Sequence, residues 1–131
     1  MKYFILTNNP QVAEEFGSTH DVRLIDGKLL DVLIHARDLI NTGAILLTHP
    51  LYGSVKPNET PFRSLLLQQG KSQNGDMPVP ADPDSVRLIG NAISAFKKFI
   101  DKKEVTDPKL LEDFSEVDLS LLRSAVESAD R

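Results

Sequence analysis

The residues best suited to chemistry gather in one polar segment, THPLYGSVKPNETP, which spans residues 48–61. The segment combines a positive charge, hydroxyls, an imidazole, a side-chain amide and a glycine, which are groups that bind small anions in proteins. They belong to His49, Gly53, Ser54, Lys56, Asn58 and Thr60. Three prolines restrict its backbone, so the segment is stiffer than an ordinary connecting loop. In the alternative interpretation, the same side chains only shape turns and satisfy local amides.

The case for catalysis in this segment is weaker. His49 could act as a general base and Ser54 as a nucleophile, with Glu59 orienting the imidazole. However, the chain has no G-x-S-x-G motif and neither of the common glycine-rich phosphate motifs. A metal site built on His49 and Glu59 would lack an evident third ligand. We therefore predict no catalytic residue, no metal and no cofactor. A small enzyme that acts on an acyl or phosphoryl compound remains the alternative.

Apolar patterning predicts the elements that must position this segment. Strands are expected at residues 2–7, 20–25, 44–48 and 63–68, and helices at 10–16, 29–42, 83–102 and within 103–131. This order predicts an α/β fold of three layers, in which a mostly parallel four-stranded sheet carries helices on both faces and the C-terminus is helical. Lys2–Thr7 and Ala44–Thr48 are largely apolar, which favours adjacent positions at the centre of the sheet.

Two further segments affect how the chain is organised. Residues 70–82 are rich in Gly, Pro, Ser and Asn and lack periodicity, so we predict a flexible loop there. Near the C-terminus, Asp107-Pro108 predicts the start of a short helix, and Ser115 with Asp118 predicts the capping box of a second one. We expect residues 1–131 to form a single domain.

In folds of this kind, ligands bind beyond the carboxyl ends of the strands. Two polar segments follow predicted strands in this way: one begins at Thr7 and the other is the 48–61 segment. We expect the two to meet and to form a site for a small anion, with Lys56 supplying the charge, or for a partner protein. The predicted ligand-binding residues are Thr7, Asn8, His49, Gly53, Ser54, Lys56 and Asn58.

Composition narrows the class of protein. The chain has no cysteine, which excludes disulfides, thiol nucleophiles and cysteine-bound metals. Its apolar runs are too short for a membrane span or a secretory signal, so we expect a cytoplasmic protein that does not associate with membranes. The net charge is −4, and Lys and Arg form no cluster, which disfavours nucleic-acid binding. The negative charge belongs to residues 101–131, which hold nine acids and five bases.

The strings KYFILTNNP and LLTHPLYGSVKPNETPFRSLLL resemble GrdX, a small family encoded among the genes for glycine, sarcosine and betaine reductases of amino-acid-fermenting anaerobic bacteria. The resemblance covers about the first 70 residues. It implies a cytoplasmic accessory or regulatory role beside selenium- and thiol-dependent reductases, with reductase components as partners, and it assigns no catalytic residue. Because the chain lacks cysteine, it could assist such a reductase but could not relay electrons through a thiol. A homo-oligomer also remains open.

Overall fold

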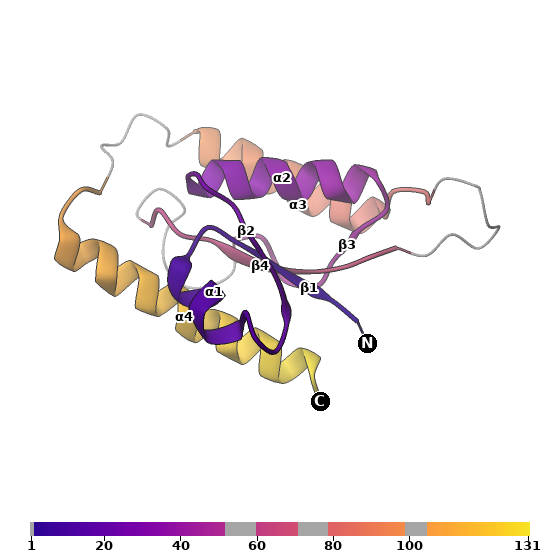
Figure 1. Ribbon diagram of the computed structural model, residues 1–131. Coiled ribbons are helices and arrows are strands. Elements are labelled where there is room, and N and C mark those ends of the chain that lie inside the picture. The colour runs from indigo at the N-terminus through magenta and orange to yellow at the C-terminus, as the bar shows by residue number, and fades with distance from the viewer. Residues whose placement is uncertain (1, 52–59, 71–78, 99–104) are drawn as a thin grey trace.

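A computed structural model describes residues 2–51, 60–70, 79–98 and 105–131. Within these ranges the chain forms the strands and helices labelled in Figure 1. In chain order they are β1 (Phe4–Thr7), α1 (Pro10–Phe16), β2 (Asp21–Leu24), α2 (Leu29–Asn41), β3 (Ile45–Leu46), β4 (Ser64–Gln68), α3 (Pro83–Lys97) and α4 (Pro108–Ala129). The chain is therefore of the α/β class, as predicted.

The sheet is mixed, which corrects the prediction of a mostly parallel one. Its strand order is β2-β1-β4-β3. β1 pairs with β2 in parallel, whereas β4 pairs antiparallel with both β1 and β3. The prediction that Lys2–Thr7 and Ala44–Thr48 are adjacent at the centre is wrong as well, because β4 lies between them and β3 forms an edge. No helix separates β3 from β4 in the described chain, and strands joined without a crossover pair antiparallel.

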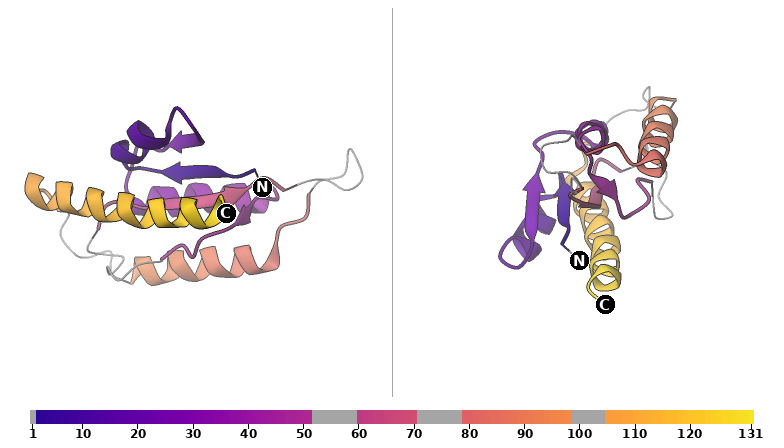
Figure 2. Two further views of the ribbon diagram at one scale, coloured as in Figure 1. Left: turned by 90° about the horizontal axis from the view of Figure 1, so that it is seen from below. Right: turned by 90° about the vertical axis from the view of Figure 1, so that its right-hand side faces the viewer.

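Successive side chains of the central strands, β1 and β4, point to opposite faces of the sheet, and both faces are buried. Phe4, Leu6 and Leu67 belong to the core shared with α2 and α3. Ile5 and Leu66 belong to the core shared with α1 and α4. Figures 1 and 2 show the corresponding arrangement, with one pair of helices on each face. In the described part of the chain, no helix is both long enough and apolar enough to cross a lipid bilayer.

The helix boundaries follow local signals in the sequence. The side chain of Asn9 caps α1 by accepting a hydrogen bond from the amide of Gln11, and the side chain of Asp82 caps α3 by accepting one from the amide of Ser85. Each cap is followed by proline, which suits the first helical position. After α2, Gly43 adopts a φ of 109°, the left-handed conformation expected there. The predicted helix starts at residues 10, 29 and 83 are confirmed.

α4 differs from its prediction, because Pro108–Ala129 is one continuous helix. Ser115 and Asp118 lie inside it and do not form a capping box. Both side chains are buried and bond to residues from the N-terminal part of the chain. Each of the two side chains therefore bonds to residues far away in the sequence, whereas in a capping box it would bond to an amide of the first helical turn. Most of the predicted flexible loop, residues 71–78 of 70–82, lies outside the described residues.

Candidate functional site

β1 ends opposite the start of β4, and this edge of the sheet carries the polar residues of interest. β3 runs in the same direction as β1, but it ends at Leu46, opposite Leu67 near the end of β4. The side chain of Asn8 fastens this edge: its Nδ2 donates to the carbonyls of Gly27 and Pro61 at 3.0 and 2.8 Å. Its Oδ1 accepts from the amide of Arg63 at 2.9 Å. Asn8 thus joins the loops that follow β1 and β2 to the segment that enters β4.

Beside this clamp, a chain of buried hydrogen bonds leads to the carboxylate of Asp118. The hydroxyl of Ser64 donates to Asp118 Oδ2 at 2.6 Å. A serine has only one hydroxyl proton, so Thr7 must donate in the 2.6 Å contact between Thr7 Oγ1 and Ser64 Oγ. Thr7 Oγ1 in turn accepts from the amide of Asn9 at 2.9 Å. Three successive donors therefore point toward one carboxylate.

The side chain of Asn9 links the same carboxylate to the first half of α4. Its Nδ2 donates to Asp118 Oδ2 at 3.1 Å and to the carbonyl of Ser115 at 2.9 Å. Its Oδ1 accepts from the hydroxyl of Ser115 at 2.8 Å. All three side chains are buried. Since a half-satisfied buried network is costly, this set of bonds fixes how α4 sits on the sheet.

Burial controls the ionisation of Asp118. Desolvation raises the pKa of its carboxyl above the ordinary value, and the hydrogen bonds from Ser64 and Asn9 and the charge of Arg63 offset only part of this effect. A raised folded-state pKa means that the folded protein holds the proton after the unfolded chain has released it. The contribution of Asp118 to stability is therefore fully present below the ordinary pKa of 3.8 and is lost as the pH rises through the folded-state pKa.

Asp118→Asn tests this ionisation. The amide oxygen can still accept from Ser64 and Asn9, but the side chain no longer titrates. We expect the free energy of unfolding of the parent to fall relative to that of Asp118→Asn as the pH rises from 3.8 through the folded-state pKa. Urea unfolding of both proteins at a series of pH values measures the difference. A difference that stays constant throughout would show that burial does not govern the ionisation of Asp118.

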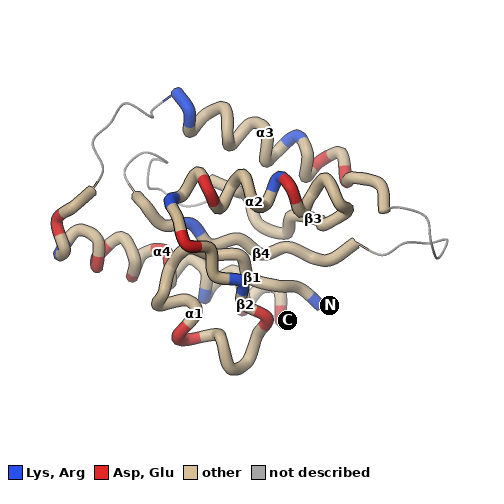
Figure 3. The backbone as a smooth tube through the Cα atoms, turned by 45° about the horizontal axis from the view of Figure 1, so that its top comes forward, with Lys and Arg blue, Asp and Glu red and all other residues tan. Residues whose placement is uncertain are grey.

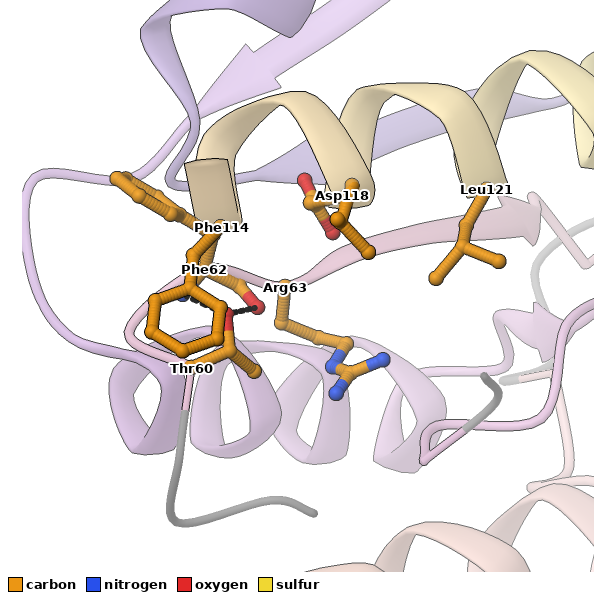
Figure 4. A pocket seen from close by; sticks show the side chains of 7 residues that line it. Thr60, Phe62, Arg63, Phe114, Asp118 and Leu121 are labelled. Atoms are coloured by element: carbon orange, nitrogen blue, oxygen red, sulfur yellow. Dashed lines mark hydrogen bonds between the residues drawn. The ribbon is translucent and has the colours of Figure 1, made fainter. Parts of the chain in front are cut away.

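A small pocket opens between α4 and the segment that enters β4 (Figure 4). Thr60, Phe62, Arg63, Phe114, Val117, Asp118 and Leu121 line it. Arg63 is only 2% exposed, and its guanidinium extends away from α4 in Figure 4. The hydroxyl of Thr60 accepts a 3.2 Å bond from the amide of Phe62, so it also serves the local turn. The edge thus combines a buried positive charge with an apolar wall.

The structure brings together some of the predicted ligand-binding residues. Thr7 and Asn8 lie at the strand ends, but both are buried and their polar atoms bond within the protein. His49 is exposed, and its Nδ1 accepts from the amide of Leu51 at 3.1 Å. Within the described residues, no hydrogen bond joins His49 to Thr7 or Asn8. The remaining predicted residues lie outside the described ranges: Gly53, Ser54, Lys56 and Asn58.

Sequence reasoning missed the partners that complete this edge, namely Asn9, Arg63, Ser64, Ser115 and Asp118. The sequence did contain a sign that Asp118 is buried: it lies four residues before Leu122 and therefore on the same side of the helix. A carboxylate next to an apolar face indicates a buried polar contact. Among the described residues, His, Asp and Glu side chains form no group of three or more that could hold a metal ion.

Comparison with known proteins places the chain in a family. No curated protein and no solved structure matches it significantly. The sequence matches the family described as GrdX-like protein over residues 4–127. This match confirms the resemblance seen in the first 70 residues and extends it to residue 127, within α4. The chain belongs to the family of GrdX-like proteins.

Proposed function

We propose that this protein is a non-catalytic accessory protein of glycine, sarcosine and betaine reductase systems, and that it binds a small anion at the edge where β1 ends and β4 begins. Family membership supports the reductase context, since the family is named for it. The absence of cysteine supports an assisting role over a thiol redox role. In this proposal the ligand is a small carboxylate or phosphate and the protein does not convert it.

The Asn8 clamp is the observation that carries the anion site. It holds the polar turn after β1 against Pro61 and Arg63, at the C-terminal end of the 48–61 segment. At the other end of that segment, Thr48 Oγ1 accepts from the amide of Leu66 at 3.2 Å. One described end of the segment is therefore bonded to β4, and the other is bonded to the residue that follows β1.

Two positive residues support an anion as the ligand. Arg63 is a buried residue that lines the pocket beside Asp118, whose carboxyl has a pKa raised by burial, and Lys56 adds a second positive charge to the segment. A guanidinium can bind a carboxylate or phosphate with two parallel hydrogen bonds. We assign the charge of Lys56 a contribution of about 1 kcal/mol to the binding free energy, which corresponds to roughly a fivefold change in affinity.

Thermal unfolding in the presence of phosphate and acetate, with chloride at equal ionic strength as the reference, tests the proposal. A bound anion stabilises the folded state by about 2.7 kcal/mol when its concentration is a hundred times its Kd. We expect at least one anion to raise the Tm of the parent. Lys56→Met should fold normally and bind that anion about fivefold more weakly, because the variant keeps the length of the side chain and loses its charge.

Lys97→Met is the matched control, because Lys97 is exposed in the last turn of α3. It should bind the anion as the parent does. The proposal fails if no anion stabilises the parent, or if Lys56→Met and Lys97→Met respond alike. Product analysis of the parent with the stabilising anion separates an accessory protein from an enzyme, and turnover would favour the enzymatic alternative.

A further inference from the structure

The carboxyl of Asp118 lies at the edge where β1 ends and β4 begins. Its Oδ2 accepts from the hydroxyl of Ser64, the first residue of β4, at 2.6 Å. The same oxygen accepts from Nδ2 of Asn9, which follows the last residue of β1 by two positions, at 3.1 Å. Asp118 is only 4% exposed and also lines the small pocket beside this edge. A buried acid therefore lies at the edge assigned to the anion.

In its ionised form, this acid opposes an anionic ligand. Two negative charges repel each other, and the repulsion is stronger in a buried environment than in water. When two acidic groups share a site, the pKa of one of them rises, so that one group holds a proton. The conflict between the ligand and Asp118 is removed in this way if the carboxyl of Asp118 is protonated.

The folded protein favours the protonated form of Asp118. Burial raises the pKa of the carboxyl, and this effect is larger than the opposing effects of its hydrogen bonds and of the charge of Arg63. Because Oδ2 already accepts from Ser64 and Asn9, we expect the proton at Oδ1. Protonation thus leaves both of these hydrogen bonds in place.

The groups around Asp118 leave it as the acid that can take up a proton at this edge. The charged residue that acts on it from a packed element is Arg63, which precedes β4 and does not titrate near neutral pH. The amide of Asn9 and the hydroxyl of Ser64 do not titrate there either. Asp113 and Glu116 on the same helix are exposed, and Figure 3 shows the acidic positions along α4.

We propose that the anion binds at this edge together with a proton, which Asp118 takes up. The inference rests on the proposed anion site and adds its regulation by pH. Binding of the anion and binding of the proton are coupled reciprocally. The affinity for the anion should therefore fall as the pH rises through the range in which Asp118 loses its proton. A coupling of ordinary size corresponds to a loss of about fivefold or more in affinity.

Isothermal titration calorimetry with acetate and with phosphate tests the coupling. Titrations at one pH in two buffers of different ionisation enthalpy count the protons taken up with each anion. Because the anions titrate as well, Asp118→Asn provides the reference: its amide oxygen can accept from Ser64 and Asn9, but the side chain takes up no proton. We expect the parent to take up more protons than Asp118→Asn. With rising pH, the parent should lose about fivefold or more in affinity relative to the variant.

Two further variants complete the experiment. Asp113→Asn removes an exposed acid from the same helix and should behave as the parent does. Ser64→Ala keeps the carboxyl of Asp118 and removes a hydrogen bond that lowers its pKa. In this variant the loss of affinity should occur at higher pH than in the parent, which tests the inference even if Asp118→Asn does not fold.

The outcomes separate this inference from the anion site on which it rests. Binding with no more proton uptake than in Asp118→Asn would overturn the coupling and leave the anion site in place. An effect of Asp113→Asn as large as that of Asp118→Asn, or a pH dependence that Ser64→Ala does not move, would also overturn the coupling. If neither anion bound to the parent at any pH, both proposals would fail.

Discussion

Asn8→Ala is expected to lower the free energy of unfolding by about 2–4 kcal/mol. The substitution removes three hydrogen bonds at once and leaves the buried amide of Arg63 without the oxygen of Asn8. Each bond contributes about 1 kcal/mol, and an unsatisfied buried group costs about 1–3 kcal/mol. Chemical denaturation of both proteins measures the loss.

Asn8→Asp separates the two halves of the clamp. The carboxylate can still accept from Arg63 but cannot donate to the carbonyls of Gly27 and Pro61, so the variant should remain less stable than the parent. Asn91→Ala on the exposed side of α3 is the control and should be nearly neutral. If Asn8→Ala and Asn91→Ala proved equally stable, the loops at this edge would not depend on Asn8.

Leu122→Ala is expected to cost about 2–5 kcal/mol, the range for truncating a buried leucine. Leu122 is fully buried and packs in the core that joins α4 to the sheet. Leu110→Ala, in the first turn of the same helix, should cost about 1 kcal/mol or less, because Leu110 is half-exposed. Calorimetric unfolding of both variants measures the contrast. Equal losses of stability would mean that the first turn of α4 is packed as tightly as the segment around Leu122.

Features set by neighbouring residues could be predicted from the sequence. The Asn-Pro and Asp-Pro pairs locate the starts of three helices, and Gly43 locates the end of α2. A cap or a left-handed turn depends on a few adjacent residues, so its physical cause is contained in the local sequence. β1, β3 and β4 are likewise recognisable as short apolar runs, whereas β2 alternates charged and apolar residues.

The strand order could not be predicted in this way. β3 and β4 are both apolar, but β3 pairs over only Ile45–Leu46 and is half-buried, whereas most of Ser64–Gln68 is buried. Apolar character alone does not reveal which of two strands lies at the centre. Pairing is decided by contacts between distant segments, here the antiparallel register of β4 with β1.

The same limit applies to the candidate site. Ser115 and Asp118 have the spacing of a capping box, and local reasoning assigns them to a helix start. Their partners, Asn9 and Ser64, are far away in the sequence, and only the folded chain brings them together. For this reason the sequence predicted that the edge beyond β1 is polar, but not that Thr7 is part of a buried network there.

The central claim is that a small anion binds at the edge where β1 ends and β4 begins. The most direct measurement is a titration of the ¹⁵N-labelled protein with the anion that stabilises it most, followed in ¹H–¹⁵N correlation spectra. We expect the amide shifts to change around Asn8, Gly27, Phe62 and Arg63 and to saturate with a single Kd, and we expect Lys56→Met to weaken that Kd about fivefold. Changes that are absent, or that scatter over exposed lysines without saturating, would contradict the claim.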